Sequence, residues 1–374
     1  MPSLARKNLF HDKTRLAVTL TGVIFALVLI LVQFGLFLGF LDTTANIVAH
    51  SRADLWVTAP GVPHVNGGSP IPERRRWQAL ADPSVDKVAA YAVSFANWKL
   101  PSGAVESVQV VGFDLETGLG GPWNLTAGSI DDLRGQDTVI LDELFLDKLG
   151  VKGIGQVAEI NGRRARVVGL TRGIRSFTTA PYAFTSLKNA RNYIGLEEEQ
   201  THFLLVKAKP GIVHGHLKSD LASRLPHTEI TTNPEMRWRT QYYWLFRTGA
   251  GITTLMGSVL GLLVGIVVVA QTIYATTMDH IREFGTLKAM GAGNGYVYRV
   301  ILKQAVLSAV IGYAFAIVIG WYVARASDAG SAAISLPPEM AVATLFVAIL
   351  MCVVASMISI RKATTIDPAM VFRG

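Results

Sequence analysis

The sequence predicts a membrane protein with four transmembrane α-helices and a large α+β extracytoplasmic domain inserted between helices 1 and 2. Half of the 374 residues are hydrophobic and only 17% are charged, which is too apolar for an ordinary soluble protein. Four stretches contain no Asp, Glu, Lys or Arg: 16–40, 248–278, 304–324 and 340–360. Each reaches the roughly 20 residues that a helix needs to cross the hydrocarbon core. The long interval 41–247 separates the first two.

The charges between the spans predict their orientation. Residues 1–15 hold four basic side chains against one acidic, 279–303 hold four against two, and 361–374 hold three against one. The connection 325–339 is weakly acidic. Since basic residues near span ends stay in the cytoplasm, we expect an amphipathic cytoplasmic segment at 1–15, a cytoplasmic segment at 279–303 and a cytoplasmic tail at 361–374. The domain 41–247 and the loop 325–339 then lie outside.

The outer segment 41–247 mixes strand and helix patterns. Strand-like runs rich in β-branched and aromatic residues lie at 53–60, 106–114 and 202–211. Residues 157–170 predict a hairpin that turns at Asn161-Gly162. Helices are expected at 73–81 and at 142–149, where Gly150 suits the C-terminal cap.

No catalytic or metal-binding pattern stands out. The sequence lacks H-E-x-x-H, G-x-S-x-G and the G-x-x-x-x-G-K-[ST] phosphate loop, so we predict a non-catalytic chain that binds no cofactor and no metal. Its one cysteine, Cys352, falls inside the fourth span, which leaves the outer domain without an internal disulfide. Because the basic excess sits beside membrane spans, we expect no nucleic-acid partner.

Some residue clusters have simple explanations. Arg74 to Arg76 and the arginines of 163–166 are interpreted as solvated surfaces. Four aromatic residues precede the second span and predict an aromatic belt at the level of the lipid headgroups: Trp238, Tyr242, Tyr243 and Trp244. Gln33 and Gln271 lie inside spans, where an amide is expected to face protein.

A stripe of glycines marks the second span. Gly257, Gly261 and Gly265 are spaced four residues apart, which lets another helix approach closely. The stripe serves either a homodimer interface or packing within one chain, and we favour the dimer.

Residues 278–290 are predicted to form a short helix between spans two and three. Ile281, Phe284, Leu287 and Met290 would form an apolar ridge, whereas Asp279, Arg282, Glu283 and Lys288 remain polar. Gly291 and Gly293 would end the helix. A helix this short is marginal alone in water, so it docks either on the inner leaflet or on a cytoplasmic protein, and the pattern alone favours neither.

Several stretches resemble a known family. They are "HDKTRLAVTLTGVIFALVLILVQFG" (11–35), "RADLWV" (52–57), "YWLFRTGAG" (243–251), "QTIYATTMDHIREFGTLKAMGA" (271–292) and "MCVVASMISIRKATTIDPAMVFRG" (351–374). Together with the layout, they resemble the MacB/FtsX-type permeases of ATP-binding-cassette (ABC) systems, and within them the DevC family. Arg282, Phe284 and Gly285 are closer to the broader MacB relatives.

The resemblance implies a function and partners. It makes 279–291 the coupling helix that docks on a separate cytoplasmic ATPase, which would bind the ATP and Mg. Arg282, Glu283, Leu287, Lys288 and Met290 are then the docking residues. It also implies two copies in the bacterial inner membrane, a periplasmic adaptor, an outer-membrane channel and export of a lipid or amphiphile.

Two alternatives share this layout. One is an FtsX-like relay that controls cell-wall hydrolases without transport, and the other is a lipoprotein-releasing permease. Near the C-terminus, Asp367-Pro368 has the pattern of a helix N-cap followed by proline at the first helical position, which would complete the cytoplasmic face.

Overall fold

A computed structural model describes residues 13–178, 180–279, 283, 285, 286, 290, 292–327 and 333–364. The described chain forms two compact units. One contains Ile252–Ser327 with the described parts of 1–39 and 334–374. The other contains the outer domain, Phe40–Gly251, with the described part of 328–333.

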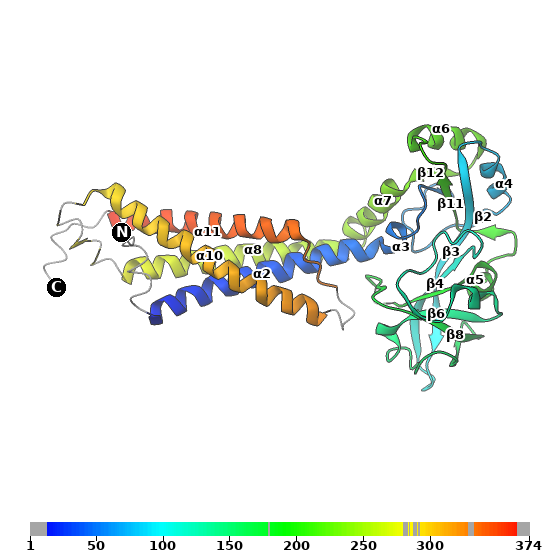
Figure 1. The fold of residues 1–374 in the computed structure, drawn as a ribbon, viewed down its shortest axis with the longest axis horizontal. Coiled ribbons are helices and arrows are strands. Elements are labelled where there is room, and N and C mark those ends of the chain that lie inside the picture. The colour runs from blue at the N-terminus through cyan, green and yellow to red at the C-terminus, as the bar shows by residue number, and fades with distance from the viewer. Residues whose placement is uncertain are drawn as a thin grey trace. The chain divides into compact units, whose positions relative to one another are not determined.

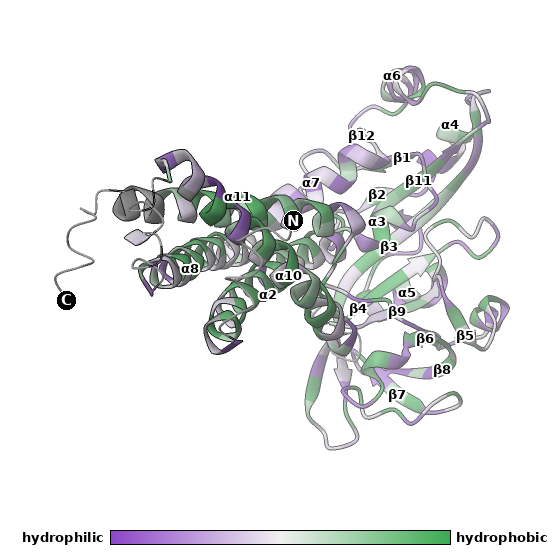
Figure 2. Cartoon of the chain, turned by 60° about the vertical axis from the view of Figure 1, so that its left-hand side comes forward, coloured by the Kyte–Doolittle hydropathy of each residue, from purple (hydrophilic) through white to green (hydrophobic). Residues whose placement is uncertain are grey.

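Four described helices are long and apolar enough to cross a membrane: α2 (Lys13–Thr44), α8 (Ala250–Asp279), α10 (Asn294–Ser327) and α11 (Pro338–Thr364). Figure 2 shows how strongly hydrophobic residues dominate these helices. The prediction of four spans is therefore confirmed. α10 begins ten residues before the predicted span 304–324, so residues 294–303, expected in a cytoplasmic loop, continue the third helix instead.

Glycines set how α2 packs on α10. A methyl group on Gly312 would lie 2.6 Å from Val23 Cγ1, and one on Gly320 would lie 3.2 Å from Leu31 Cδ1. In both contacts the α10 residue follows its α2 neighbour by the same number of positions in the sequence. The two helices therefore run parallel. α11 joins α10 through Tyr313, whose hydroxyl donates to Ala341 O at 2.9 Å.

The outer domain contains the strands and the shorter helices (Figure 1). Its strands are β1 (Leu55–Thr58), β2 (Ile71–Pro72), β3 (Val85–Lys99), β4 (Val105–Phe113), β5 (Leu125–Ala127), β6 (Thr138–Asp142), β7 (Val157–Ile160), β8 (Arg163–Thr171), β9 (Tyr182–Ser186), β10 (Gln200–Thr201), β11 (Phe203–Ala208) and β12 (Glu229–Thr232). Its helices are α3 (Asn46–Ala49), α4 (Arg75–Leu80), α5 (Leu187–Ile194), α6 (His214–Arg224) and α7 (Asn233–Phe246), with 3-10 turns η1 (Ile130–Arg134) and η2 (Glu143–Phe145).

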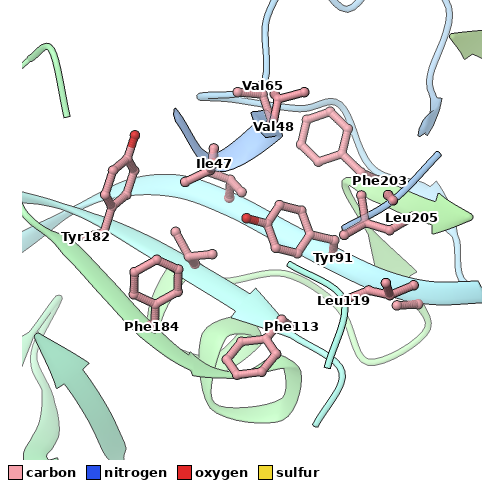
Figure 3. Packing of buried hydrophobic residues seen from close by; sticks show 14 of the residues in the cluster. Ile47, Val48, Val65, Tyr91, Phe113, Leu119, Tyr182, Phe184, Phe203 and Leu205 are labelled. Atoms are coloured by element: carbon pink, nitrogen blue, oxygen red, sulfur yellow. The ribbon is translucent and has the colours of Figure 1, made fainter. Parts of the chain in front are cut away.

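One half of the outer domain is an antiparallel sheet in the order β12-β1-β11-β3. Because strand side chains alternate between faces, Leu55 and Val57 join one buried cluster with α6, whereas Trp56 joins another. α3 and α7 contribute to this second cluster, where Ile47 and Val48 lie over Tyr91 and Phe203 (Figure 3). Both faces are covered, which explains why every residue of β1 is buried.

The other half is a closed barrel. The ladder runs β3-β4-β9-β6-β8, and β7 pairs with both β8 and β3, so no edge is left open among these strands. β3 is long enough to belong to both halves. Trp98 fills the barrel interior and donates from its indole nitrogen to Leu149 O at 3.0 Å.

Most predicted elements of the outer domain occur. The strands at 53–60, 106–114 and 202–211 correspond to β1, β4 and β11, and the hairpin β7-β8 turns at Asn161 and Gly162, both at positive φ. The helix at 73–81 is α4. The predicted helix at 142–149 is wrong: only the 3-10 turn η2 forms, because the Asp142 carboxylate accepts hydrogen bonds from Thr171 and from the Ile174 N–H and ties the chain to β8.

Candidate functional site

The segment between α8 and α10 is described at a few positions. Asp279 is the last residue of α8 and is exposed, as is Glu283. The Met290 N–H donates to Thr286 O, four residues earlier, at 3.0 Å, as in a helical turn. The Met290 side chain is 72% exposed. The other predicted docking residues lie outside the described residues, as does the tail motif: Ile281, Arg282, Phe284, Leu287, Lys288, Asp367 and Pro368.

The glycine stripe of α8 contacts α2 of the same chain. A methyl group on Gly261 would lie 3.0 Å from Gln33 Cγ, and one on Gly265 would lie 3.0 Å from Ile30 Cδ1. A methyl group on Gly257 would lie 3.5 Å from Gln33 Oε1. The stripe therefore packs within the chain, and it does not present the free surface that our favoured dimer interpretation needs. The glycines remove the side chains that would hold the two helices apart.

The contact between α2 and α8, called the α2–α8 seam below, continues to the other end of α8. The hydroxyls of Thr19 and Thr276 are 2.8 Å apart, and a methyl group on Gly22 would lie 2.6 Å from Thr272 Oγ1. As residue numbers rise along α2 they fall along α8, so the helices are antiparallel and in contact along the seam. The end of α8 that leads into 279–291 is thus joined to α2 by close contacts.

The aromatic residues of α7 divide into two groups. Trp238, Tyr242 and Phe246 form an exposed ladder, with neighbouring rings 6.2 Å and 5.0 Å apart. Trp244 instead packs on Phe177 and donates to Asn66 Oδ1 at 3.0 Å. The sequence predicts one belt of four aromatic residues; in the structure the Trp244 indole nitrogen is used within the outer domain, and only part of the group is exposed.

His64 packs on the same aromatic group. Its ring lies 4.4 Å from that of Tyr243 and 5.3 Å from that of Trp244. Burial disfavours the charged imidazolium and lowers the pKa of His64 to about 4. This histidine is therefore neutral in the folded domain at neutral pH.

The arginine clusters differ from each other. Arg76 forms an ion pair with Asp114 at 3.0 Å, and Arg75 donates to Pro226 O, so the first cluster holds loops in place. Arg163, Arg164 and Arg166 are exposed on β8, as expected for a solvated face.

Family comparisons cover both units. The model of the MacB-like periplasmic core domain matches residues 16–223, and that of the FtsX-like permease C-terminal region matches residues 244–368. The chain belongs to the MacB/FtsX-type family of ABC transporter permeases. Family membership implies a cytoplasmic ATPase partner.

The chain is also similar to individual proteins. The permease is 22% identical over 387 residues to an uncharacterized ABC transporter permease of Mycobacterium tuberculosis, with 99% of each chain covered. It is 27% identical over 317 residues to the macrolide export ATP-binding/permease protein MacB of Shewanella oneidensis, covering 76% of this chain and 46% of that one. The periplasmic region of MacB from Actinobacillus actinomycetemcomitans is 14% identical, with a TM-score of 0.40 over 52% of this chain and 94% of that one.

The sequence prediction missed the half of the seam that lies nearer Asp279. Thr19, Gly22, Thr272 and Thr276 were not singled out, although all four contribute to the closest contacts between α2 and α8. The signal was present as small and hydroxyl residues spaced three or four apart on each helix, a pattern typical of helix contacts in membranes.

Proposed function

We propose that this permease is the membrane subunit of an ABC exporter of the MacB and DevC kind, working as two copies with a separate cytoplasmic ATPase. The ATPase docks on 279–291. Nucleotide-driven motion of that segment passes along the α2–α8 seam to the outer domain, and the exported substrate is a lipid or another amphiphile. The termini and 279–291 are cytoplasmic in this scheme, and the outer domain faces the periplasm.

The observation that carries the proposal is the α2–α8 seam. α8 begins four residues after α7, the last helix of the outer domain, and ends at Asp279, the first residue of the coupling segment. Its contacts with α2 extend from Gly257 to Thr276. A push on one end of such a packed helix pair moves the pair as a unit because close-packed interfaces deform little. The charge pattern around the spans supports a cytoplasmic position for 279–291, where an ATPase could reach it.

Docking residues are tested with charge substitutions on the predicted apolar ridge. An Ile281→Asp/Leu287→Asp variant introduces two carboxylates where apolar side chains enter a groove. Loss of an interface anchor costs about 2 kcal/mol or more, roughly a thirtyfold rise in Kd. We expect the permease to insert normally but to lose its ATPase during purification.

A matched control places the same charges on the outer domain. Val157 and Val213 are exposed there, 48% and 62% respectively, so Val157→Asp/Val213→Asp adds two carboxylates without touching the coupling segment. The control should retain the ATPase. Equal recovery of the ATPase with both variants contradicts the docking assignment.

The resemblance to the family is what supports a periplasmic adaptor and an outer-membrane channel as partners. Crosslinking of the intact permease in cells tests them, because capture of a periplasmic adaptor by the outer domain supports export. Capture of a peptidoglycan hydrolase instead supports the signalling relay, and release of lipoproteins from membranes that contain the complex supports the lipoprotein-releasing role.

A further inference from the structure

Four neighbouring strands of the barrel, β4, β3, β7 and β8, expose one face to solvent. Lys99 on β3 is paired with Val105 on β4 and with Glu159 on β7. Glu159 is in turn paired with Arg164 on β8. Residues that are paired across strands point to the same side of a sheet, so these four side chains form one row. Neighbouring strands are about 4.8 Å apart, which makes the row roughly 14 Å long.

A second, shorter row lies beside the first. Val157 on β7 is paired with Arg166 on β8. Ala158 and Ala165, the residues between the two rows, pack in the core of the barrel. Because strand side chains alternate between faces, both rows lie on the outer surface. We call the side chains of the two rows the barrel face: Val105, Lys99, Glu159, Arg164, Val157 and Arg166.

The barrel face exposes large apolar side chains. Val105 is 59% exposed and Val157 is 48% exposed. Phe95, which lies on the same side of β3 as Lys99, is 41% exposed. Single apolar residues on a surface are normal, but several on one face beside charged residues are typical of a protein-binding surface.

The charges of the barrel face are unbalanced. Lys99 Nζ lies 3.2 Å from Glu159 Oε2, so these two charges compensate each other. Arg164 and Arg166 are exposed, and neither side chain forms an ion pair or a hydrogen bond within the part of the chain that the structure describes. This includes Asp137, whose backbone carbonyl accepts from the Arg166 N–H. Two guanidinium groups, each with five N–H donors, are therefore left without an acidic partner.

The spacing of the two arginines fits an extended acidic segment. Arg164 and Arg166 are two residues apart on β8, which corresponds to about 6.6–6.8 Å along a strand. Alternate side chains of any extended chain have the same spacing, so carboxylates at alternate positions of a second chain match both guanidinium groups. Arginine is well suited to this role because its planar fork binds a carboxylate through two hydrogen bonds.

A protein segment fits the barrel face better than an anionic membrane surface does. Lipid headgroups present negative charge throughout, whereas Glu159 places a carboxylate between Lys99 and Arg164 in the same row. Headgroups also offer no apolar contact for Val105 and Val157. The barrel strands have no open edge to which a partner could add a strand, so side chains carry the recognition.

We propose that the barrel face binds an acidic, extended segment of a protein on the same side of the membrane as the outer domain. Carboxylates of that segment pair with Arg164 and Arg166, and its apolar side chains pack on Val105 and Val157. The proposal depends neither on the docking of an ATPase at 279–291 nor on what the permease exports.

Photocrosslinking in cells tests whether such a partner is present. Val157→p-benzoylphenylalanine keeps an apolar side chain on the barrel face and reacts with whatever lies against it. Cells of the native host that express the intact permease at its native level are irradiated, and the crosslinked peptide is sequenced by mass spectrometry. We expect one protein, joined through a segment that carries acidic residues at alternate positions.

Variants in the crosslinking background test the role of the arginines. Arg164→Glu/Arg166→Glu turns attraction into repulsion and should lower the crosslink yield about tenfold or more, whereas Arg164→Gln/Arg166→Gln should lower it about threefold. Arg74→Glu/Lys209→Glu is the matched control, because it makes the same change in charge at two exposed residues outside the barrel face. The control should keep the full yield. Thermal unfolding checks that each variant is folded.

A charge exchange completes the test. Replacing the two acidic residues of the captured segment with arginine should restore the crosslink to Arg164→Glu/Arg166→Glu. Failure of this restoration, or equal yields from that variant and its control, would remove the arginines from the contact. Crosslinks to lipid alone, or no crosslinked protein, would rule out a protein partner. A crosslink to a second copy of the permease would overturn the proposal by making the barrel face a contact between copies.

Discussion

Replacing Gly22 with alanine adds one methyl group to the tightest part of the α2–α8 seam. That methyl would lie 2.6 Å from Thr272 Oγ1 and 3.3 Å from Cγ2 of the same side chain. The threonine cannot rotate away freely, because its hydroxyl donates to Val268 O at 2.7 Å. Overpacking of this kind costs about 1–3 kcal/mol, partly offset by about 1 kcal/mol from the better helix propensity of alanine.

The control for this change is Gly257→Ala on the same seam. The added methyl group would lie 3.5 Å from Gln33 Oε1, its nearest neighbour, which is an ordinary contact. That variant therefore gains the helix propensity of alanine without the clash. We expect Gly22→Ala to unfold about 2–12 °C below Gly257→Ala, from ~1–3 kcal/mol and ~2–4 °C per kcal/mol. Thermal unfolding in one detergent, followed by intrinsic fluorescence, measures this difference.

A second substitution tests whether Thr272 causes the effect. Thr272→Ala removes the atom that the new methyl group meets, so the pair Gly22→Ala/Thr272→Ala should recover most of the lost stability. A coupling energy of about 0.5–3 kcal/mol is expected for residues in contact. If Gly22→Ala is as stable as Gly257→Ala, or if Thr272→Ala gives no rescue, the seam is not packed as described.

Three further predictions concern the outer domain. Acidification should destabilise the outer domain. His64 stays neutral in the folded domain because its pKa is lowered to about 4 from 6.5. Its contribution to the free energy of unfolding is therefore full above about pH 6.5 and is lost as the pH falls toward 4. His64→Phe should make the fall in Tm between pH 7 and 4.5 shallower; an unchanged slope refutes this role. Asn161→Ala leaves the Asn97 N–H on β3 and the Tyr193 carbonyl on α5 without their side-chain partner. It should cost about 1–3 kcal/mol, seen as a lower Tm; a neutral result contradicts it. Trp244→Phe loses the bond to Asn66 and should cost about 0.5–1.5 kcal/mol, whereas Trp238→Phe on the exposed face should leave Tm unchanged.

The spans were predictable because membrane crossing imposes a length and an absence of charge that the sequence shows directly. Strands β1, β4 and β11 were found from β-branched and aromatic residues between turn formers, and the Asn161-Gly162 turn from the residue types that accept positive φ. These features depend on local chemistry alone.

The remaining features depend on contacts distant in sequence. The 142–149 stretch has helix-forming residues, but Asp142 is bonded to residues about thirty positions later, and these bonds determine the local conformation. Likewise, the glycine stripe predicts that some helix approaches closely without saying which one. Its partner, α2, lies more than 200 residues earlier in the chain.

The aromatic residues of α7 do not share one environment, for a similar reason. Trp238 and Trp244 are equally aromatic and lie on one helix, yet only Trp244 meets Phe177 and Asn66. Their different environments arise from packing within the outer domain, which the local pattern does not contain.

The most direct test of the account is purification of the intact permease from its native host in a mild detergent, with mass spectrometry of the proteins that co-elute. We predict stoichiometric recovery of an ABC ATPase that carries its own phosphate-binding loop, together with a periplasmic adaptor. The permease is expressed at its native level for this purification. Its recovery with no ATPase would contradict the assignment of 279–291 as a coupling segment.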